Sequence, residues 1–361
     1  MSLGVASCAK GNTGREAPST TSYAMADVRD DGIDVPSYKV IMASSTHSPL
    51  RTVAGLIVMA AIMVAAFYGL SKVLREVSFH EVEQAMSRIG WGRIALATLF
   101  GAASYLVLTG YDVIALRTIG RPLPWRQAAK ASFVSYNLSH NLGFAVLTGA
   151  VARFRIYSAA GLGVADIAKI TVLTGVSFWI GVLLTLGLCL VFIPDVSSLA
   201  GYEMGWATQA AIGLVIVDLN VMYLIVLSRG MKEIGFRSWR VPLPSAGLGL
   251  VQCGLSVLDL VFAASVLAVL MPSLDAAGWT QVLVAYVAAF VTVMITHTPG
   301  GAGVLELVVV TLVPDVAKAE VIAALILFRL VYHIGPFLLA VGLFASHEVS
   351  ARRRKALHST P

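Results

Sequence analysis

The chain has 361 residues, of which 57% are apolar and only 13% are charged. A typical soluble chain carries about 25% charged residues, so this one could not cover its surface. The mean hydropathy is +0.81, and the apolar residues fall in runs long enough to cross about 30 Å of hydrocarbon as helices. This excludes a soluble enzyme, a disordered chain and a nucleic-acid-binding domain, and it predicts an all-α integral membrane protein.

The chain has a net charge of +6, and the positions of its basic residues indicate what this charge is for. They lie between the apolar runs and at the C-terminus, as expected of cytoplasmic loops that face anionic lipid. We therefore expect a membrane as the partner and no nucleic acid. Cys189 and Cys253 lie inside apolar runs, so we predict no disulfide framework.

The polar segments and the apolar runs divide the chain into three parts. Residues 1–50 are polar and aperiodic and predict a flexible N-terminal extension. Residues 51–346 predict a polytopic transmembrane domain, and residues 347–361 a basic cytoplasmic tail. Mixed charges at 72–93 predict an interfacial helix. About six full transmembrane helices are expected, at residues 54–70, 94–116, 170–193, 204–228, 242–270 and 321–345.

Loop charge sets the orientation of these spans. Segments 117–130 and 229–240 and the C-terminal tail are rich in Arg and Lys and are expected in the cytoplasm. Segments 194–203 and 272–277 carry acids and no bases and are expected outside. This places both termini in the cytoplasm.

Two further apolar segments, 131–152 and 279–313, do not fit this orientation if each crosses once. We expect each to enter the membrane and return as a re-entrant helical hairpin. Hairpins entering from opposite faces suggest an inverted-repeat transporter in which they meet at a central site. The alternative is that one of them crosses fully and the positive-inside rule is broken once.

Ionisable residues inside apolar runs are costly, so each is a candidate for a site. Asp112 is either functional or an interfacial acid paired with Arg117 or a neighbouring base. Asp259 shares a helical face with Gln252 and Ser256. That polar stripe serves either interhelical hydrogen bonding or transport.

The segment from His297 to Gly301 interrupts the second hairpin, because Pro299 ends one helix and Gly300 permits unusual backbone geometry. The next short helix could direct free N–H groups at an anion such as phosphate. Glu306, in its first turn, could cap that helix, hold a cation or pair with a base. A purely structural helix break is the alternative.

Three arginines complete the candidate residues. Arg153 and Arg155 could bind a phospholipid head group through charge-assisted hydrogen bonds, or serve only as positive-inside anchors. Arg329 shares a helix face with Tyr332, His333 and Pro336, and it needs a partner, either Glu306 or Asp259. It forms a structural ion pair or contacts lipid. No catalytic or metal-ligand spacing is present, so we expect no catalytic residues, metal or cofactor.

Three segments together resemble the signatures of a known family. Residues 137–144 with 148–157, residues 297–306 and residues 328–336 resemble the lysylphosphatidylglycerol synthase transmembrane region, the flippase part of the multiple peptide resistance factor (MprF). The resemblance extends over about residues 51–345. It implies a bacterial inner (plasma) membrane protein that handles phosphatidylglycerol or aminoacyl-phosphatidylglycerol.

The resemblance also implies a role. Two-part family members move lysyl-phosphatidylglycerol to the outer leaflet, which lowers surface negative charge and gives resistance to cationic peptides. They continue into a soluble transferase domain, which we expect this stand-alone member to lack, so an enzyme is not expected.

The leading hypothesis is a lipid translocase whose ligand is an anionic or aminoacylated phospholipid. Arg153 and Arg155 would engage the phosphate. The remaining residues expected to bind the lipid along a polar path are Asn137, His140, Asn141, His297, Glu306, Arg329, Tyr332 and Asp259. The alternatives are a membrane partner of a separate aminoacyl-phosphatidylglycerol transferase, or a secondary transporter of a small polar solute that uses Asp218 and Asp259.

Overall fold

The computed structural model describes residues 64, 68–69, 71–72, 75–142, 145–194, 196, 204–236, 239–296 and 298–358. The predicted extension at 1–50, most of the predicted span at 54–70, and His297 lie outside these residues. Within the described ranges the chain is almost entirely helical, and one short two-stranded ribbon is the only sheet.

The elements follow the predicted runs closely. The helices are α2 (Phe79–Arg88), α3 (Trp91–Thr118), α4 (Trp125–Leu142), α5 (Ala145–Ser158), α6 (Val164–Phe192), α8 (Trp206–Ser228), α9 (Ala246–Val269), α10 (Ala276–Thr296), α11 (Val304–Leu312), α12 (Lys318–Phe328) and α13 (Gly335–His358). The strands β1 (Glu233–Phe236) and β2 (Trp239–Pro242) pair antiparallel. A 3-10 turn at Pro299–Gly301 precedes α11, and a π-helical segment, Arg329–Ile334, joins α12 to α13.

Six described helices are long and apolar enough to cross a membrane: α3, α6, α8, α9, α10 and the continuous helix from α12 into α13. This confirms the prediction of an all-α integral membrane protein. Five of the six coincide with predicted full spans. The sixth, α10, was assigned from the sequence to the second hairpin. The interfacial helix expected at 72–93 is shorter in the structure. It is α2, which begins at a capping box formed by Ser78 and Glu81.

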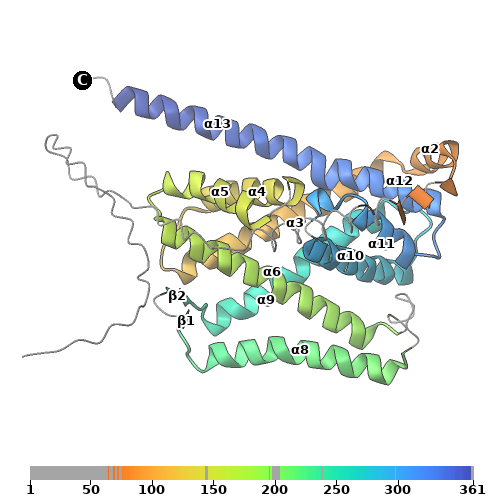
Figure 1. The fold of residues 1–361 in the computed structure, drawn as a ribbon, viewed down its shortest axis with the longest axis horizontal. Helices are drawn as coiled ribbons and strands as arrows, with labels where there is room; N and C mark the ends of the chain where they lie inside the picture. The colour runs from red at the N-terminus through yellow and green to blue at the C-terminus, as the bar shows by residue number, and fades with distance from the viewer. Residues whose placement is uncertain are drawn as a thin grey trace, which may run out of the picture. The chain divides into compact units, whose positions relative to one another are not determined.

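The first hairpin consists of α4 and α5, which pack against each other (Figure 1). It is longer than the 131–152 expected, because α4 begins at Trp125 and α5 ends at Ser158. Arg153 and Arg155 therefore lie within α5 instead of following the hairpin. From this position in α5 the Arg153 side chain reaches Asp112 of α3.

The second hairpin consists of α10 and the shorter α11, which also pack together. Gln281, near the start of α10, donates a 3.2 Å hydrogen bond to Asp315, which follows α11. The chain therefore returns to the side from which it came. The whole of α10, Ala276–Thr296, rises about 30 Å, so this contact between its start and the end of α11, and not the length of the helix, supports a hairpin. The geometry agrees with a helix that enters and returns.

The two hairpins begin at opposite ends of the helices (Figure 1). At one end, Arg121 beside α4 lies 3.8 Å from Asp166 of α6, among the basic segments. At the other end, Lys318 pairs with Glu76 and holds the pKa of that carboxyl below its usual value through a hydrogen bond and its positive charge. The ends that the sequence assigns to opposite sides of the membrane are thus separate in the structure.

Helix α9 is central and packs against α3, α6, α8, α10 and α12. Its polar stripe faces inward. Gln252 Nε2 donates to Ser177 Oγ of α6 at 2.6 Å, and Ser256 Oγ donates to the Ser177 carbonyl at 2.8 Å. Gly181 of α6 permits this approach, because a Cβ there would lie 2.8 Å from the Ser256 carbonyl oxygen. This part of the stripe serves interhelical hydrogen bonding.

Candidate functional site

The tips of the two hairpins meet. Gly300, at the tip of the second hairpin, lies beside the last residues of α4, and a Cβ built on it would be 3.6 Å from the Asn141 carbonyl oxygen and 4.0 Å from that of His140. Gly300 and Gly301 have φ values of 60° and 63°, which favour glycine because other residues are strained there. The sequence predicted this meeting of two broken helices at a central site.

Arg329 holds the tip of the second hairpin in place. Its Nη1 donates to the Gly300 carbonyl at 2.8 Å and its Nη2 to the Gly301 carbonyl at 3.2 Å. Its Nε forms an ion pair with Glu306. The guanidinium thus donates to the Gly300 and Gly301 carbonyl oxygens, which lie in the break between two helices and lack regular helical donors. Of the two partners considered from the sequence, Glu306 is the correct one.

Glu306 has two of the three roles considered from the sequence. Its Oε2 accepts the Gly303 backbone N–H at 2.8 Å and so caps α11, while Oε1 pairs with Arg329. The Arg329 and Glu306 side chains remain 24% and 15% exposed. Both charges are therefore within reach of a small group that approaches the hairpin tips.

The polar residues of α4 divide into two groups. Asn137 is buried, accepts a 2.9 Å hydrogen bond from the Tyr105 hydroxyl and donates to the Phe133 carbonyl at 2.8 Å. Its position makes it part of the framework. His140 and Asn141 are partly exposed and lie at the tip, where they can face a ligand.

The π-helical segment has a physical cause. Pro336 has no N–H to offer the Tyr332 carbonyl four residues earlier, and the Gly335 N–H bonds to the Leu330 carbonyl instead. The Tyr105 hydroxyl of α3 lies 2.9 Å from the freed Tyr332 oxygen and 2.9 Å from Asn137 Oδ1, so its single hydrogen is shared between these two acceptors. A neighbouring helix thus supplies the donor that the proline removes, as buried membrane helices require.

Asp259 belongs to a second polar cluster, separate from the Arg329 ion pair. Ser104 donates to its carboxylate at 2.6 Å and Tyr111 at 3.4 Å, and the Tyr332 hydroxyl lies 2.8 Å from Ser104 Oγ. None of the ion pairs among the described residues includes Asp259. Asp218, which the solute-transporter alternative combines with it, lies exposed on α8.

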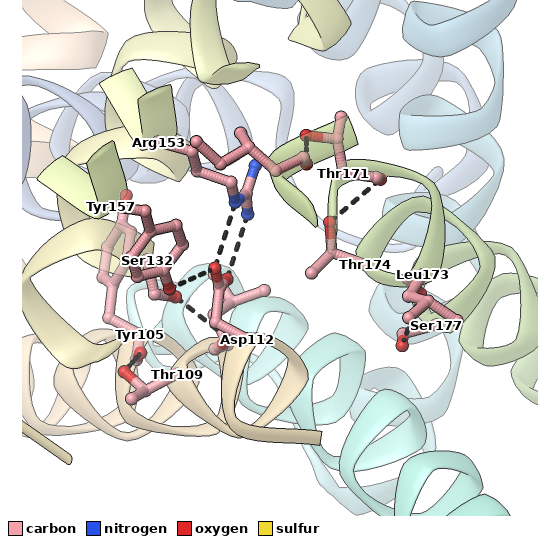
Figure 2. Close-up of polar contacts among 12 residues, drawn as sticks. Tyr105, Thr109, Asp112, Ser132, Arg153, Tyr157, Thr171, Leu173, Thr174 and Ser177 are labelled. Atoms are coloured by element: carbon pink, nitrogen blue, oxygen red, sulfur yellow. Dashed lines mark hydrogen bonds and ion pairs between the residues drawn. The ribbon is translucent and has the colours of Figure 1, made fainter. Parts of the chain in front are cut away.

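Arg153 does not offer a free guanidinium to a lipid phosphate in this structure. Its Nε and Nη2 each donate to Asp112 at 3.0 Å, and the Tyr157 hydroxyl donates to the same carboxylate at 2.8 Å (Figure 2). Arg153 is 4% exposed and Asp112 is fully buried. The guanidinium also lies over the Tyr136 ring, 4.8 Å from its centroid. The base that pairs with Asp112 is therefore Arg153 and not Arg117.

Arg155 remains accessible on the same helix. Its side chain is 58% exposed and lies 3.6 Å from Glu348 of α13. An exposed ion pair of this kind contributes little to stability. Of the two arginines that the sequence proposed for phosphate, Arg155 is exposed and Arg153 is buried in its pair with Asp112.

Two residues near the tips were not among the site residues predicted from the sequence. Tyr105 joins α4 to the π-helical segment, and His333 is buried with no hydrogen-bond partner for Nδ1 among the described residues. Pro336, four residues after Tyr332, is the one signal in the sequence for a displaced carbonyl. Among the described residues, no group of three or more His, Cys, Asp or Glu side chains could hold a metal ion.

The paired hairpins and the broken helices at their tips define a polytopic membrane protein with an internal polar site. A family model described as the lysylphosphatidylglycerol synthase TM region matches residues 52–340. The chain belongs to this family, as its three signature segments predicted.

Three relatives illustrate the range of this similarity. The chain is 28% identical to uncharacterized protein slr0712 of Synechocystis, over 85% of this chain and 96% of that protein. It is 27% identical to the inner membrane protein YbhN of Escherichia coli, over 74% of this chain and 84% of that protein. It is 22% identical to the phosphatidylglycerol lysyltransferase of Staphylococcus haemolyticus, over 87% of this chain but only 36% of that protein.

Proposed function

We propose that this protein is a membrane lipid translocase for phosphatidylglycerol or aminoacyl-phosphatidylglycerol. One observation carries the proposal: hairpins from opposite ends meet at a partly exposed ion pair, Arg329 with Glu306. Broken backbone at membrane depth is stable only where protein or a wet cavity surrounds it. Such a meeting point is where transporters of this design bind substrate.

The two charges suit the two ends of an aminoacylated head group. A guanidinium binds a phosphate through charge-assisted hydrogen bonds, and a carboxylate complements the amino group of the aminoacyl part. In the resting protein Arg329 and Glu306 neutralise each other, and a bound head group would replace each partner in turn. His140, Asn141 and the buried imidazole of His333 supply further polar atoms beside them.

The proposal has consequences for the cell. Movement of an aminoacylated lipid to the outer leaflet would lower its negative charge and so increase resistance to cationic peptides. The basic end of the bundle would face the cytoplasm of a bacterial inner membrane, with Arg155 there to meet incoming head groups. The Escherichia coli relative is named as an inner membrane protein, which supports this location.

One observation favours a second candidate. The match to 36% of a phosphatidylglycerol lysyltransferase is compatible with a membrane partner that presents lipid to a separate transferase. Such a partner would bind the same lipids without moving them between leaflets. Lipid transfer distinguishes the two candidates.

The test is lipid transfer in proteoliposomes, with fluorescent phosphatidylglycerol and lysyl-phosphatidylglycerol measured in parallel. We expect Glu306→Gln to slow transfer of lysyl-phosphatidylglycerol about tenfold, which corresponds to a loss of about 1.4 kcal/mol of charge-dependent binding. The same variant should slow transfer of phosphatidylglycerol less, because that lipid has no amino group. We expect Arg329→Gln to slow both. Glu320→Gln is the matched control, because Glu320 also lies in the first turn of a helix but faces Ser273 at the bundle end.

Each variant is first shown to elute as a single species. Transfer by the wild type that both site variants lose, and that Glu320→Gln keeps, supports the translocase. No protein-dependent transfer of either lipid by folded protein refutes it.

A further inference from the structure

A groove with a volume of about 650 Å³ lies on a different side of the π-helical segment from the ion pair. Leu330 and Val331 of that segment line the groove, whereas the neighbouring Arg329 contacts Glu306. The other walls come from α3, α4 and α13. One short segment therefore separates the groove from the hairpin tips.

The groove exists because its walls carry small residues where helices would otherwise pack. Gly101 and Ala102 of α3 line the groove and present no large side chain to it. Gly335 and Pro336, the first residues of α13, also line the groove, after the π-helical segment has interrupted the regular helix. The small residues of α3 and the irregular backbone before α13 thus leave a space between the helices that no side chain fills.

The groove walls are chemically apolar. Three hydroxyl-bearing residues line it, and each hydroxyl is bonded within the protein. Thr98 donates to the Ile94 carbonyl at 2.8 Å, Thr109 to the Tyr105 carbonyl at 3.2 Å, and Tyr105 to its partners on the inner side. These three hydroxyls therefore offer a polar solute no unused donor, whereas a hydrocarbon chain needs none.

One end of the groove is charged. Lys130 and Trp125 of α4 lie there, at the end of the bundle where the basic segments gather. Among the described residues no carboxylate forms an ion pair with Lys130. Tryptophan favours the membrane–water interface. A lysine that forms no ion pair with a described carboxylate, and that lies beside an interfacial tryptophan, complements a lipid phosphate.

The length of the groove fits one lipid chain. Along α3, the distance from Thr98 to Thr109 is about 16 Å, roughly the thickness of one leaflet of a 30 Å hydrocarbon core. The apolar walls then cover the chain below the head group. No hydrophobic partner helix is needed to explain a surface of this kind in a membrane.

We propose that this groove binds one acyl chain of an anionic diacyl phospholipid whose phosphate is held by Lys130. The choice of lipid class rests on the proposed function. The groove would hold a lipid from the cytoplasmic leaflet beside the segment that carries Arg329, in position for transfer to the hairpin tips.

The test measures lipid retained by the purified full-length protein, by native mass spectrometry after incubation with dioleoylphosphatidylglycerol or dioleoylphosphatidylcholine. We expect Lys130→Gln to retain at least fivefold less phosphatidylglycerol and to lower phosphatidylcholine retention much less, because the choline cation offsets the phosphate charge. We expect Ala102→Trp, which fills the groove, to retain less of both. Arg126→Gln and Leu214→Trp are matched controls: the first neutralises a neighbouring exposed base, and the second adds a tryptophan on the exposed face of α8.

The outcomes separate this inference from the proposed function. If Lys130→Gln and Ala102→Trp both retain as much lipid as the wild type, the inference is wrong, even if lipid transfer is normal. Reduced retention with no lipid transfer by the wild type supports the groove and refutes the translocase. If Ala102→Trp instead converts a dimer to a monomer, the groove is an interface between copies of the chain and the lipid inference is wrong.

Discussion

Replacing Arg153 by Met is expected to destabilise the protein strongly. The Asp112 carboxylate, fully buried, accepts two 3.0 Å hydrogen bonds from the Arg153 guanidinium and one from Tyr157. After the substitution only the tyrosine hydroxyl remains. Removing one member of a buried ion pair costs about 3–5 kcal/mol, because the other is left without compensation.

Arg155 provides an internal control two residues further along α5. Its pair with Glu348 spans 3.6 Å and its side chain is 58% exposed, so Arg155→Met is expected to cost about 0–1 kcal/mol. A double variant, Asp112→Leu with Arg153→Met, removes both buried charges. We expect it to recover most of the lost stability, since a buried pair replaced by apolar residues is often neutral.

The assay is the fraction of purified protein that remains monodisperse after heating. Arg153→Met is expected to lower the midpoint by on the order of 5–10 °C, and Arg155→Met by much less. Equal midpoints for these two single variants would refute the structural role of the buried pair. Lipid transfer by the folded double variant then separates a packing role of Arg153 from a binding role. Normal transfer would show that Arg153 does not contact the substrate. Loss of transfer would support the phosphate-binding role predicted from the sequence.

Two further substitutions test helix packing by the same heating assay. Tyr105→Phe leaves the Tyr332 carbonyl without the 2.9 Å hydroxyl contact, and we expect a loss of about 1–3 kcal/mol; no change would mean that the carbonyl has another donor. Gly181→Ala places a Cβ 2.8 Å from the Ser256 carbonyl and is expected to cost about 1–3 kcal/mol. Gly175→Ala, in the same helix with open space around it, is expected to stabilise by about 0.5–1 kcal/mol, so effects of the same sign would contradict the close approach of α6 to α9.

The membrane-spanning helices could be predicted from the sequence because the lipid imposes simple requirements. Hydrocarbon demands about 20 apolar residues per crossing and leaves no backbone group unbonded, so α3, α6, α8 and α9 appear as plain apolar runs. The hairpins followed from loop charge, since segments 117–130 and 194–203 permit only an odd number of crossings between them. The three signature segments, two in the hairpins and one across the π-helical segment, identified the family.

The partners of the buried charges could be decided only by the tertiary structure. Asp112 and Arg153 are 41 residues apart, and Arg117 was the nearer base along the chain. Similarly, two acids were candidate partners for Arg329, and the structure pairs it with Glu306 and not with Asp259. Pairing depends on how helices rotate and cross, which packing of many side chains determines together. Apolar length and loop charge are local properties of the chain, whereas the distance between two charges on different helices is not.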